Sequence, residues 1–295
     1  MKQGKGKFMN RMILVKVIIP VLWVSCVCWA GQCSKSPEAQ PTGPTTDPID
    51  AILDKLHKTT SELTSFECQI EYKYSQPLLE SERLSKGTLY YMRSGGTSAM
   101  RINFSTLQQD DEKERKYIEQ YIILDGAKMN HPVRVFKGIW LVHLDYQIEQ
   151  AKYYQLAEPN DPNVSPDVFD LVGRELPMLG FSKIEDLKKQ FEITLIEQKK
   201  SPSGGFTQVH LDVKPNSVYK DDFVSIDFWI DKKFGLPAKI IAVKTEPEPP
   251  FGDIEEIKLL KPKVNKGVDG NIFEFKIPGS FGEPEITPLS KNRQQ

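Results

Sequence analysis

The chain has 295 residues, with 39 Lys and Arg against 40 Asp and Glu, 39% hydrophobic residues and four cysteines. A balanced charge without a basic face argues against nucleic acid as a partner. So few cysteines exclude a disulfide framework, even in an oxidising compartment.

The first 30 residues have the composition of an export signal. They hold five Lys or Arg and no acidic residue, and they are apolar from Met12 to Ala30. The apolar core from Val17 is shorter than the ~20 residues that a membrane-spanning helix needs. We therefore predict a signal peptide over residues 1–30. Its removal leaves 34 basic and 40 acidic residues, a net charge of −6.

Two alternatives for this segment stay open. Cleavage before Cys26, which follows Val24 and Ser25, would leave a lipid-anchored N-terminus. An uncleaved signal would anchor the chain by its own apolar run.

The rest of the chain divides by composition into three parts. Residues 31–46 are rich in Pro and Thr without apolar periodicity, which is typical of a linker. Residues 47–285 are expected to form one domain, within the size that single all-β domains reach. Residues 286–295 form a polar tail.

The folded part is expected to begin with an amphipathic helix. Asp47 is a suitable N-cap, Pro48 suits the first helical position, and the apolar side chains then share one face. These side chains are Ile49, Ile52, Leu53, Leu56 and Leu63. We expect this helix to lie as a lid with one apolar side.

Alternation of apolar and polar residues predicts strands over most of the chain between residues 65 and 277. The expected strands are Ser65–Tyr74, Thr88–Arg93, Met100–Phe104, Tyr117–Leu124, Ile139–Asp145, Ala151–Leu156, Phe191–Ile196, Gln208–Val213, Val224–Ile230, Ala238–Val243, Ile254–Leu260 and Phe273–Ile277. Turn residues such as Asp125-Gly126 and Phe234-Gly235-Leu236-Pro237 separate them. Charged residues 110–116 are expected to form a solvated hairpin tip.

One interruption, residues 165–190, is expected to be helical, with a capping box made by Ser182 and Glu185. An antiparallel sheet of this many strands twists and curls. Two helices are too few to cover both of its faces. We therefore predict a mainly β fold, an incomplete barrel whose concave apolar face is capped by helices.

Catalytic motifs of the common kinds are missing from the sequence, which argues against an enzyme. The tripeptide His-Leu-Asp occurs twice, at His143–Asp145 and His210–Asp212, with both polar side chains on one face of a strand. A hydrogen-bonded pair is the simpler interpretation of each. We predict no catalytic residue and no metal site.

Several motifs, in order, resemble those of the LolA-like family of periplasmic outer-membrane lipoprotein carriers. They are the strand opening Ser65-Phe66, residues 87–93 (Gly-Thr-Leu-Tyr-Tyr-Met-Arg), Met100-Arg101-Ile102, Leu124-Asp125-Gly126 and Trp140 ahead of residues 147–151. The turn from Trp229 to Pro237 and residues 273–279 are similar to the family's return and closing strand.

The resemblance implies a periplasmic protein that binds acyl chains of lipoproteins or other lipids without a cofactor. It implies, as partners, an inner-membrane lipoprotein-release transporter and an outer-membrane acceptor. We expect twelve side chains to line the lipid cavity: Phe66, Ile70, Tyr72, Leu89, Tyr91, Ile102, Phe104, Trp140, Leu144, Val224, Ile226 and Phe228. Each of them alone would also suit a packed core.

The family's lid-latching arginine corresponds to Arg93 by the Gly-x-Leu-aromatic-x-x-Arg pattern. Ser94 replaces the proline that follows it in the family, and extra residues precede Arg101, which is a competing assignment. Residues 127–137 and 157–180 are insertions relative to the family. Because the same fold also hosts sensor domains, an envelope interaction module with a packed core and a protein partner remains the alternative function.

Overall fold

The computed structural model describes residues 48–129, 135–159, 161, 167–168, 171, 184–196, 205–245 and 252–289. The predicted signal and linker lie outside these ranges, as do the two predicted caps, Asp47 and Ser182. No helix in these ranges is long and apolar enough to cross a bilayer.

Helix α1 spans Pro48–Ser61 and has one apolar face, as the sequence predicts. Leu53 and Leu56 on this face are buried. Asp50 in the first turn and Lys58 in the last turn complement the helix dipole. A second helix, α3 (Ile184–Gln190), lies within the predicted helical interruption and leads directly into the next strand.

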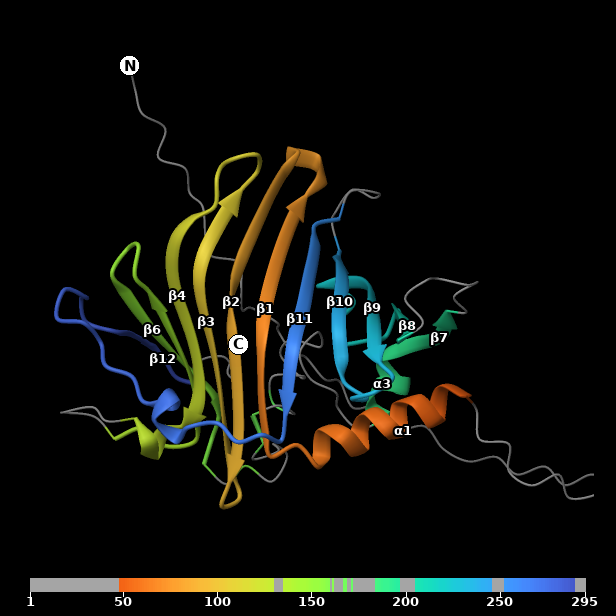
Figure 1. The fold of residues 1–295 in the computed structure, drawn as a ribbon, viewed down its shortest axis with the longest axis horizontal. Helices are drawn as coiled ribbons and strands as arrows, with labels where there is room; N and C mark the ends of the chain where they lie inside the picture. The colour runs from red at the N-terminus through yellow and green to blue at the C-terminus, as the bar shows by residue number, and fades with distance from the viewer. Residues whose placement is uncertain are drawn as a thin grey trace, which may run out of the picture. The chain divides into compact units, whose positions relative to one another are not determined.

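Twelve strands form a single sheet in the order β12-β6-β5-β4-β3-β2-β1-β11-β10-β9-β8-β7. The sheet curls but does not close, so that β12 and β7 are its edges (Figure 1). The strands are β1 Ser65–Gln76, β2 Ser81–Ser94, β3 Thr97–Gln109, β4 Arg115–Asp125, β5 Ile139–Asp145, β6 Gln150–Ala157, β7 Phe191–Ile196, β8 Phe206–Val213, β9 Phe223–Asp231, β10 Pro237–Lys244, β11 Ile254–Val264 and β12 Glu285–Thr287. The predicted mainly β, incomplete barrel is confirmed.

Strands β2 and β3 are longer than their apolar patterns predict, with 14 and 13 residues. Their outer ends, the start of β2 and the end of β3, are polar, so alternation fades there although the ladder continues; β3 then turns at residues 110–114 into β4. The pair is irregular between Lys86 and Gly87. A Cβ atom on Gly87 would lie 2.0 Å from the carbonyl oxygen of Asn103, so this close approach of backbones requires glycine.

The sheet buries apolar side chains on both faces. The concave core is the cluster on the face that α1 covers, and it includes Leu56, Phe66, Ile70, Leu89, Tyr91, Met100, Phe104, Ile226, Phe228, Ile240 and Ile257. The outer core is the cluster on the opposite face, and it includes Ala99, Ile122, Leu124, Trp140, Val142, Leu144, Ala151, Tyr153 and Phe273. Strand β4 serves both clusters, because Ile123 belongs to the first while Ile122 and Leu124 belong to the second.

The C-terminal segment differs from the prediction of a strand at Phe273–Ile277. Residues Gly270–Phe273 form a short 3-10 helix, and Asp269 caps it by accepting a hydrogen bond from the backbone N–H of Asn271. The residues after it pack their apolar side chains on the outer core instead of joining the ladder. The chain then adds β12, which was not predicted and pairs with β6 in parallel over three residues.

Candidate functional site

Nine of the twelve predicted lining residues lie on the concave face. Seven of them are buried in the concave core, namely Phe66, Ile70, Leu89, Tyr91, Phe104, Ile226 and Phe228. Tyr72 and Ile102 are partly buried and pack against it. These side chains come from β1, β2, β3 and β9, and period-two alternation places them on one face of the curled sheet.

Trp140 and Leu144 lie on the other face and belong to the outer core, which corrects the prediction for β5. Both faces of β5 are apolar, since Ile139 and Leu141 pack against the concave core. Alternation therefore separates the two sets of side chains but does not say which set faces inward. Trp140 packs against Phe136, at 4.9 Å between ring centroids, in the core that also includes Phe273 of the C-terminal segment.

Val224 also differs from its prediction, because it is 53% exposed. It alternates with Ile226 and Phe228 in sequence, but the register of β9 against β10 shifts beside it. Phe223 and Ser225 have partners in β10 there, and Val224 is skipped. This irregularity turns Phe223, not Val224, into the core.

Helix α1 is fixed over the concave face by polar contacts at three places along its length. Near its start, Asp50 forms an ion pair with Lys188 of α3. In the middle, the Nζ atom of Lys55 donates to the carbonyl oxygen of Lys232, in the turn between β9 and β10, at 2.8 Å. At its end, Arg93 of β2 donates to the carbonyl oxygen of Ser61 at 2.5 Å. Figure 1 shows α1 beside α3, near strands β7–β10 of the sheet.

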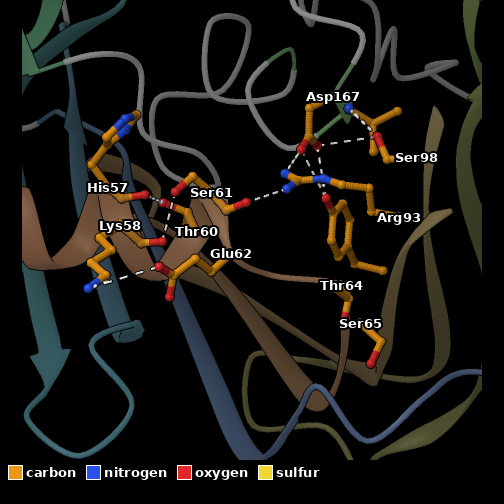
Figure 2. A network of polar contacts seen from close by, with 12 residues as sticks. His57, Lys58, Thr60, Ser61, Glu62, Thr64, Ser65, Arg93, Ser98 and Asp167 are labelled. Carbon is orange, nitrogen blue, oxygen red and sulfur yellow. Dashed lines mark hydrogen bonds and ion pairs between the residues drawn. The ribbon is translucent and has the colours of Figure 1, made fainter. Parts of the chain in front are cut away.

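Arg93 is the centre of the largest polar network at the lid (Figure 2). Besides its bond to Ser61, it forms an ion pair with Asp167. The Asp167 carboxylate also accepts hydrogen bonds from the hydroxyl of Tyr91, at 3.0 and 3.1 Å, and from that of Ser98, at 3.2 Å. The backbone N–H of Val168 donates in turn to the Ser98 hydroxyl at 2.7 Å. A carboxylate whose side chain is only 10% exposed is thereby fully supplied with donors.

The network joins three separate parts of the chain. Arg93 and Tyr91 belong to β2, Ser98 belongs to β3, and Asp167 lies far along the sequence next to the buried Val168. The carbonyl oxygens in the last turn of a helix lack partners within the helix and carry the negative end of its dipole. A guanidinium at the end of α1 satisfies one of them, so the position of α1 depends directly on the Arg93 side chain.

Arg101, the competing assignment for the latch, lies on the opposite face. Its guanidinium donates to the carbonyl oxygens of Ile272 and Glu274 at 2.5 and 2.8 Å, and to the side chain of Gln120 at 2.9 Å. Burial lowers the pKa of this arginine. Arg101 therefore holds the C-terminal segment, and of the two arginines Arg93 is the one that contacts the lid helix.

Farther along the strands the concave face becomes polar. Glu119 of β4 is 8% exposed. One of its oxygens accepts from the hydroxyl of Tyr121 at 2.7 Å and lies 2.8 Å from Nε2 of His143. Burial by itself raises the pKa of Glu119, but the hydrogen bonds from His143 and Tyr121 outweigh it and hold the pKa below its usual value. The concave face is thus apolar under the helices and charged beyond them.

The histidines of both His-Leu-Asp motifs form ordinary polar pairs, but only His210 pairs with the Asp of its own motif, whereas His143 pairs with Glu119. His143 pairs with Glu119 and stacks on the ring of Tyr121 at 4.4 Å, while Asp145 accepts from the backbone N–H of Gln147 in the following turn. His210 lies between Asp227 and Asp212, at 3.0 and 3.2 Å. Within the described ranges no group of three or more His, Cys, Asp or Glu side chains is arranged to hold a metal ion.

Comparison with known proteins finds no matching family model and no similar curated sequence. Solved structures are found, and their likeness is distant. MucB is 12% identical with a TM-score of 0.43, over 79% of this chain and 65% of that one. A LolA superfamily protein from Nitrosomonas europaea is 11% identical with a TM-score of 0.33, over 76% of this chain and 96% of that one.

A third neighbour is an outer membrane lipoprotein-sorting protein domain from Vibrio parahaemolyticus. It is 11% identical with a TM-score of 0.35, over 76% of this chain and 95% of that one. The neighbours thus include the class of protein that the sequence motifs resemble, a mainly β, LolA-like class, and the resemblance is one of fold. Likenesses this distant say nothing about the ligand or partner of this chain.

Several residues of the site were not predicted from the sequence. Asp167, Ser98 and Lys55 look like ordinary surface residues there, and only the fold brings them to the lid. Asp167 lies in the insertion 157–180, for which the resemblance offers no equivalent. Tyr91 was predicted as a lining residue, but the contact of its hydroxyl with Asp167 was not. A weak signal for it existed, because its place two residues before Arg93 puts both side chains on one face of a strand.

Proposed function

We propose that this protein is an exported, non-enzymatic carrier that binds acyl chains on its concave face, with α1 as a lid and Arg93 as its latch. The observation that carries the proposal is the network in which Arg93 ties the end of α1 to Asp167, above an apolar face. Such an arrangement couples a hydrophobic binding surface to a helix held by polar contacts at a few points.

The free energy of the Arg93 hydrogen bond can be compared with the free energy of burying part of an acyl chain. A hydrogen bond that involves a charged group contributes roughly 1.5–3 kcal/mol. Transfer of a methylene group from water to an apolar surface gains ~0.8 kcal/mol, so roughly four methylene groups would offset one such bond. An acyl chain is several times longer than that. Burial of an acyl chain can therefore offset the loss of the Arg93 bond when the lid opens.

The destination and cargo are inferred from the N-terminal composition and from the family resemblance. A cleaved signal, or a lipid anchor at Cys26, would put the protein in the periplasm. There it would carry the acyl chains of lipoproteins toward the outer membrane, between an inner-membrane release transporter and an outer-membrane acceptor. Non-directional apolar contacts would tolerate acyl chains of different kinds.

The test uses the full chain recovered from the cells that export it. Mass spectrometry of the intact protein and of its solvent extract should report the cleavage site, any N-terminal acylation and a co-purified lipid. The delipidated protein should take up a fluorescent fatty acid, and Arg93→Gln should speed both uptake and release. Arg115→Gln, at the exposed start of β4, is the matched control and should change neither. A protein without lipid that also ignores the fluorescent fatty acid would overturn the proposal.

A second candidate is an envelope interaction module whose concave face stays packed and whose partner is a protein. The observation that favours it is the depth of burial, since Tyr91, Ile226 and Phe228 are at most 1% exposed. A permanent core has the same property. The fatty-acid uptake assay distinguishes the two candidates. A packed module would show no uptake by the wild type and no effect of Arg93→Gln.

A further inference from the structure

A second apolar recess lies beside the turn that joins β9 to β10, the turn whose Lys232 carbonyl accepts the hydrogen bond from Lys55 of α1. It is an open groove with a volume of about 340 Å³, and most of its lining is apolar. Aromatic side chains contribute much of this lining, namely Phe66, Phe206, Trp229 and Phe234. The volume falls in the range of about 300–1,000 Å³ that is usual for small-molecule sites.

The groove is built from two layers. Trp229, Lys239 and Lys258 form a row across β9, β10 and β11 on the outer face, because Lys239 pairs in register with both of the others. Beneath this row the groove reaches Leu236 and Leu259, which belong to the concave core. A ligand here would contact the end of the core from the outer face.

The apolar character of the groove stands out against its surroundings. On the same outer face the neighbouring strand positions are polar, as at His210, Asp212 and Asp227. Leu260 in the groove is instead 36% exposed. Exposed apolar side chains gathered at a recess, within a polar face, are typical of a binding site.

The rim of the groove is cationic. Lys239 and Lys258 share a single carboxylate, that of Glu256, at 3.5 and 3.0 Å. Lys261 forms no ion pair with any residue in the described ranges.

The acid of the lining, Asp231, is already engaged. Its carboxylate accepts the backbone N–H groups of Lys233 and Phe234 within its own turn. Positive charge therefore exceeds negative charge around an apolar floor. Two ammonium groups that share one carboxylate leave capacity for a second anion.

We propose that this groove binds an anionic amphiphile, with its acyl chain along Trp229 and Phe234 and its carboxylate or phosphate at Lys258 and Lys261. A peptide that extends the sheet is a poorer occupant, because β9, β10 and β11 are internal strands with both edges paired. Charge complementarity favours an anionic ligand over a neutral one. The groove opens on the outer face of the sheet, opposite the Arg93 latch, and meets the concave core at Phe66, Leu236 and Leu259.

Trp229 provides the reporter for a direct test. A brominated fatty acid quenches tryptophan fluorescence at short range, so the full-length protein as exported should be quenched on titration. Trp140→Phe should retain this quenching, because Trp140 lies in the outer core. Trp229→Phe should lose it. Unchanged quenching in Trp229→Phe would overturn the proposal.

The lysines distinguish this groove from any acyl chain bound elsewhere. The double variant Lys258→Gln, Lys261→Gln should raise the Kd for the brominated fatty acid about tenfold, since it removes the charges that face the carboxylate. The Kd for the matching brominated methyl ester should not change between wild type and variant. Equal Kd values of the wild type and the double variant for the acid would contradict an anion site.

The outcomes separate the groove from the carrier proposal. Arg93→Gln should leave the quenching of Trp229 unchanged, because its contacts lie on the opposite side of the sheet from the lysine row. Quenching of Trp229 in a protein that carries no co-purified lipid would support the groove and count against the carrier. A co-purified lipid together with an unquenched Trp229 would support the carrier and count against the groove.

Discussion

The two faces of this sheet are covered in different ways. On the concave face, α1 is tied by side chains at three places and rests on apolar residues. On the outer face of β2–β6, residues 268–287 form a cover that is interlocked with the sheet by aromatic rings and ends in a strand, β12. The few contacts of α1 would let this helix separate from the concave face as a unit. The contacts of residues 268–287 favour a permanent cover on the outer face.

Contacts of several kinds hold the outer cover, residues 268–287, on the sheet. Phe275 packs edge-on against Tyr153 at 6.4 Å, and Phe281 packs edge-on against Tyr146 at 5.1 Å. Arg101 adds hydrogen bonds to two backbone carbonyls of the segment. Side chains, backbone and a short ladder all have to separate together, which makes opening of this cover part of global unfolding.

The largest effect is expected from Phe273→Ala, which removes the buried aromatic side chain at the start of the outer cover. Phe273 is 6% exposed, and truncation of a buried Phe costs about 3–5 kcal/mol. Chemical denaturation should show a single transition shifted by this amount. Lys276→Ala, in an exposed position of the same segment, is the control. A separate early transition for the C-terminal segment would mean that the outer cover opens by itself.

A smaller loss is expected for Arg101→Ala, about 2 kcal/mol, since hydrogen bonds to charged groups contribute roughly 1.5–3 kcal/mol each and water replaces part of them. Arg101→Lys should recover only a fraction, because one ammonium group can replace the Nη1 bonds to the two carbonyls but not also the Nη2 and Nε bonds to Gln120 and Asn103. Thermal unfolding of both variants would measure the difference. Full recovery by lysine would show that charge alone, without the fork geometry, fixes the segment.

Arg93→Gln should cost the folded state less, about 1 kcal/mol, because the side chain is 31% exposed and such pairs contribute little. Its larger effect should be local. Hydrogen exchange of the backbone amides of α1 should become faster, while exchange in β12 should not change. If both covers exchanged faster by the same factor, the lid would not be an independent unit.

The sequence predicted the lid and the sheet well because their signals are local. The apolar face of α1 repeats at helical spacing, and β5 and β7 have the predicted bounds. The Arg93 position was predicted from a motif within one strand. Lysines of the groove were not predicted, since Lys239 and Lys258 become neighbours only when β10 and β11 pair.

The failures have a common physical origin. Phe273–Ile277 alternates like a strand, but its apolar side chains pack on the outer core and no edge is available for pairing there. Trp140 and Leu144 were assigned to the wrong face because β5 is apolar on both sides. Asp167 could not be assigned at all, because a carboxylate in an irregular segment shows no sign of the arginine that it will meet.

The smallest effect concerns the outer face of β8 and β9, where His210 lies between two carboxylates. Burial by itself lowers the pKa of His210, but hydrogen bonds and charge from Asp227 and Asp212 outweigh it and raise the pKa. A raised folded-state pKa stabilises the protein fully below the unfolded value of about 6.5, and this stabilisation is lost as the pH rises through the folded-state pKa. The stability difference between wild type and His210→Gln should therefore be larger at low pH than at high pH. Thermal unfolding at several pH values would measure this difference, with His57→Gln, at an exposed position of α1, as the control. A difference that grows with pH would mean that neutral, not protonated, His210 makes the stabilising contacts on the outer face.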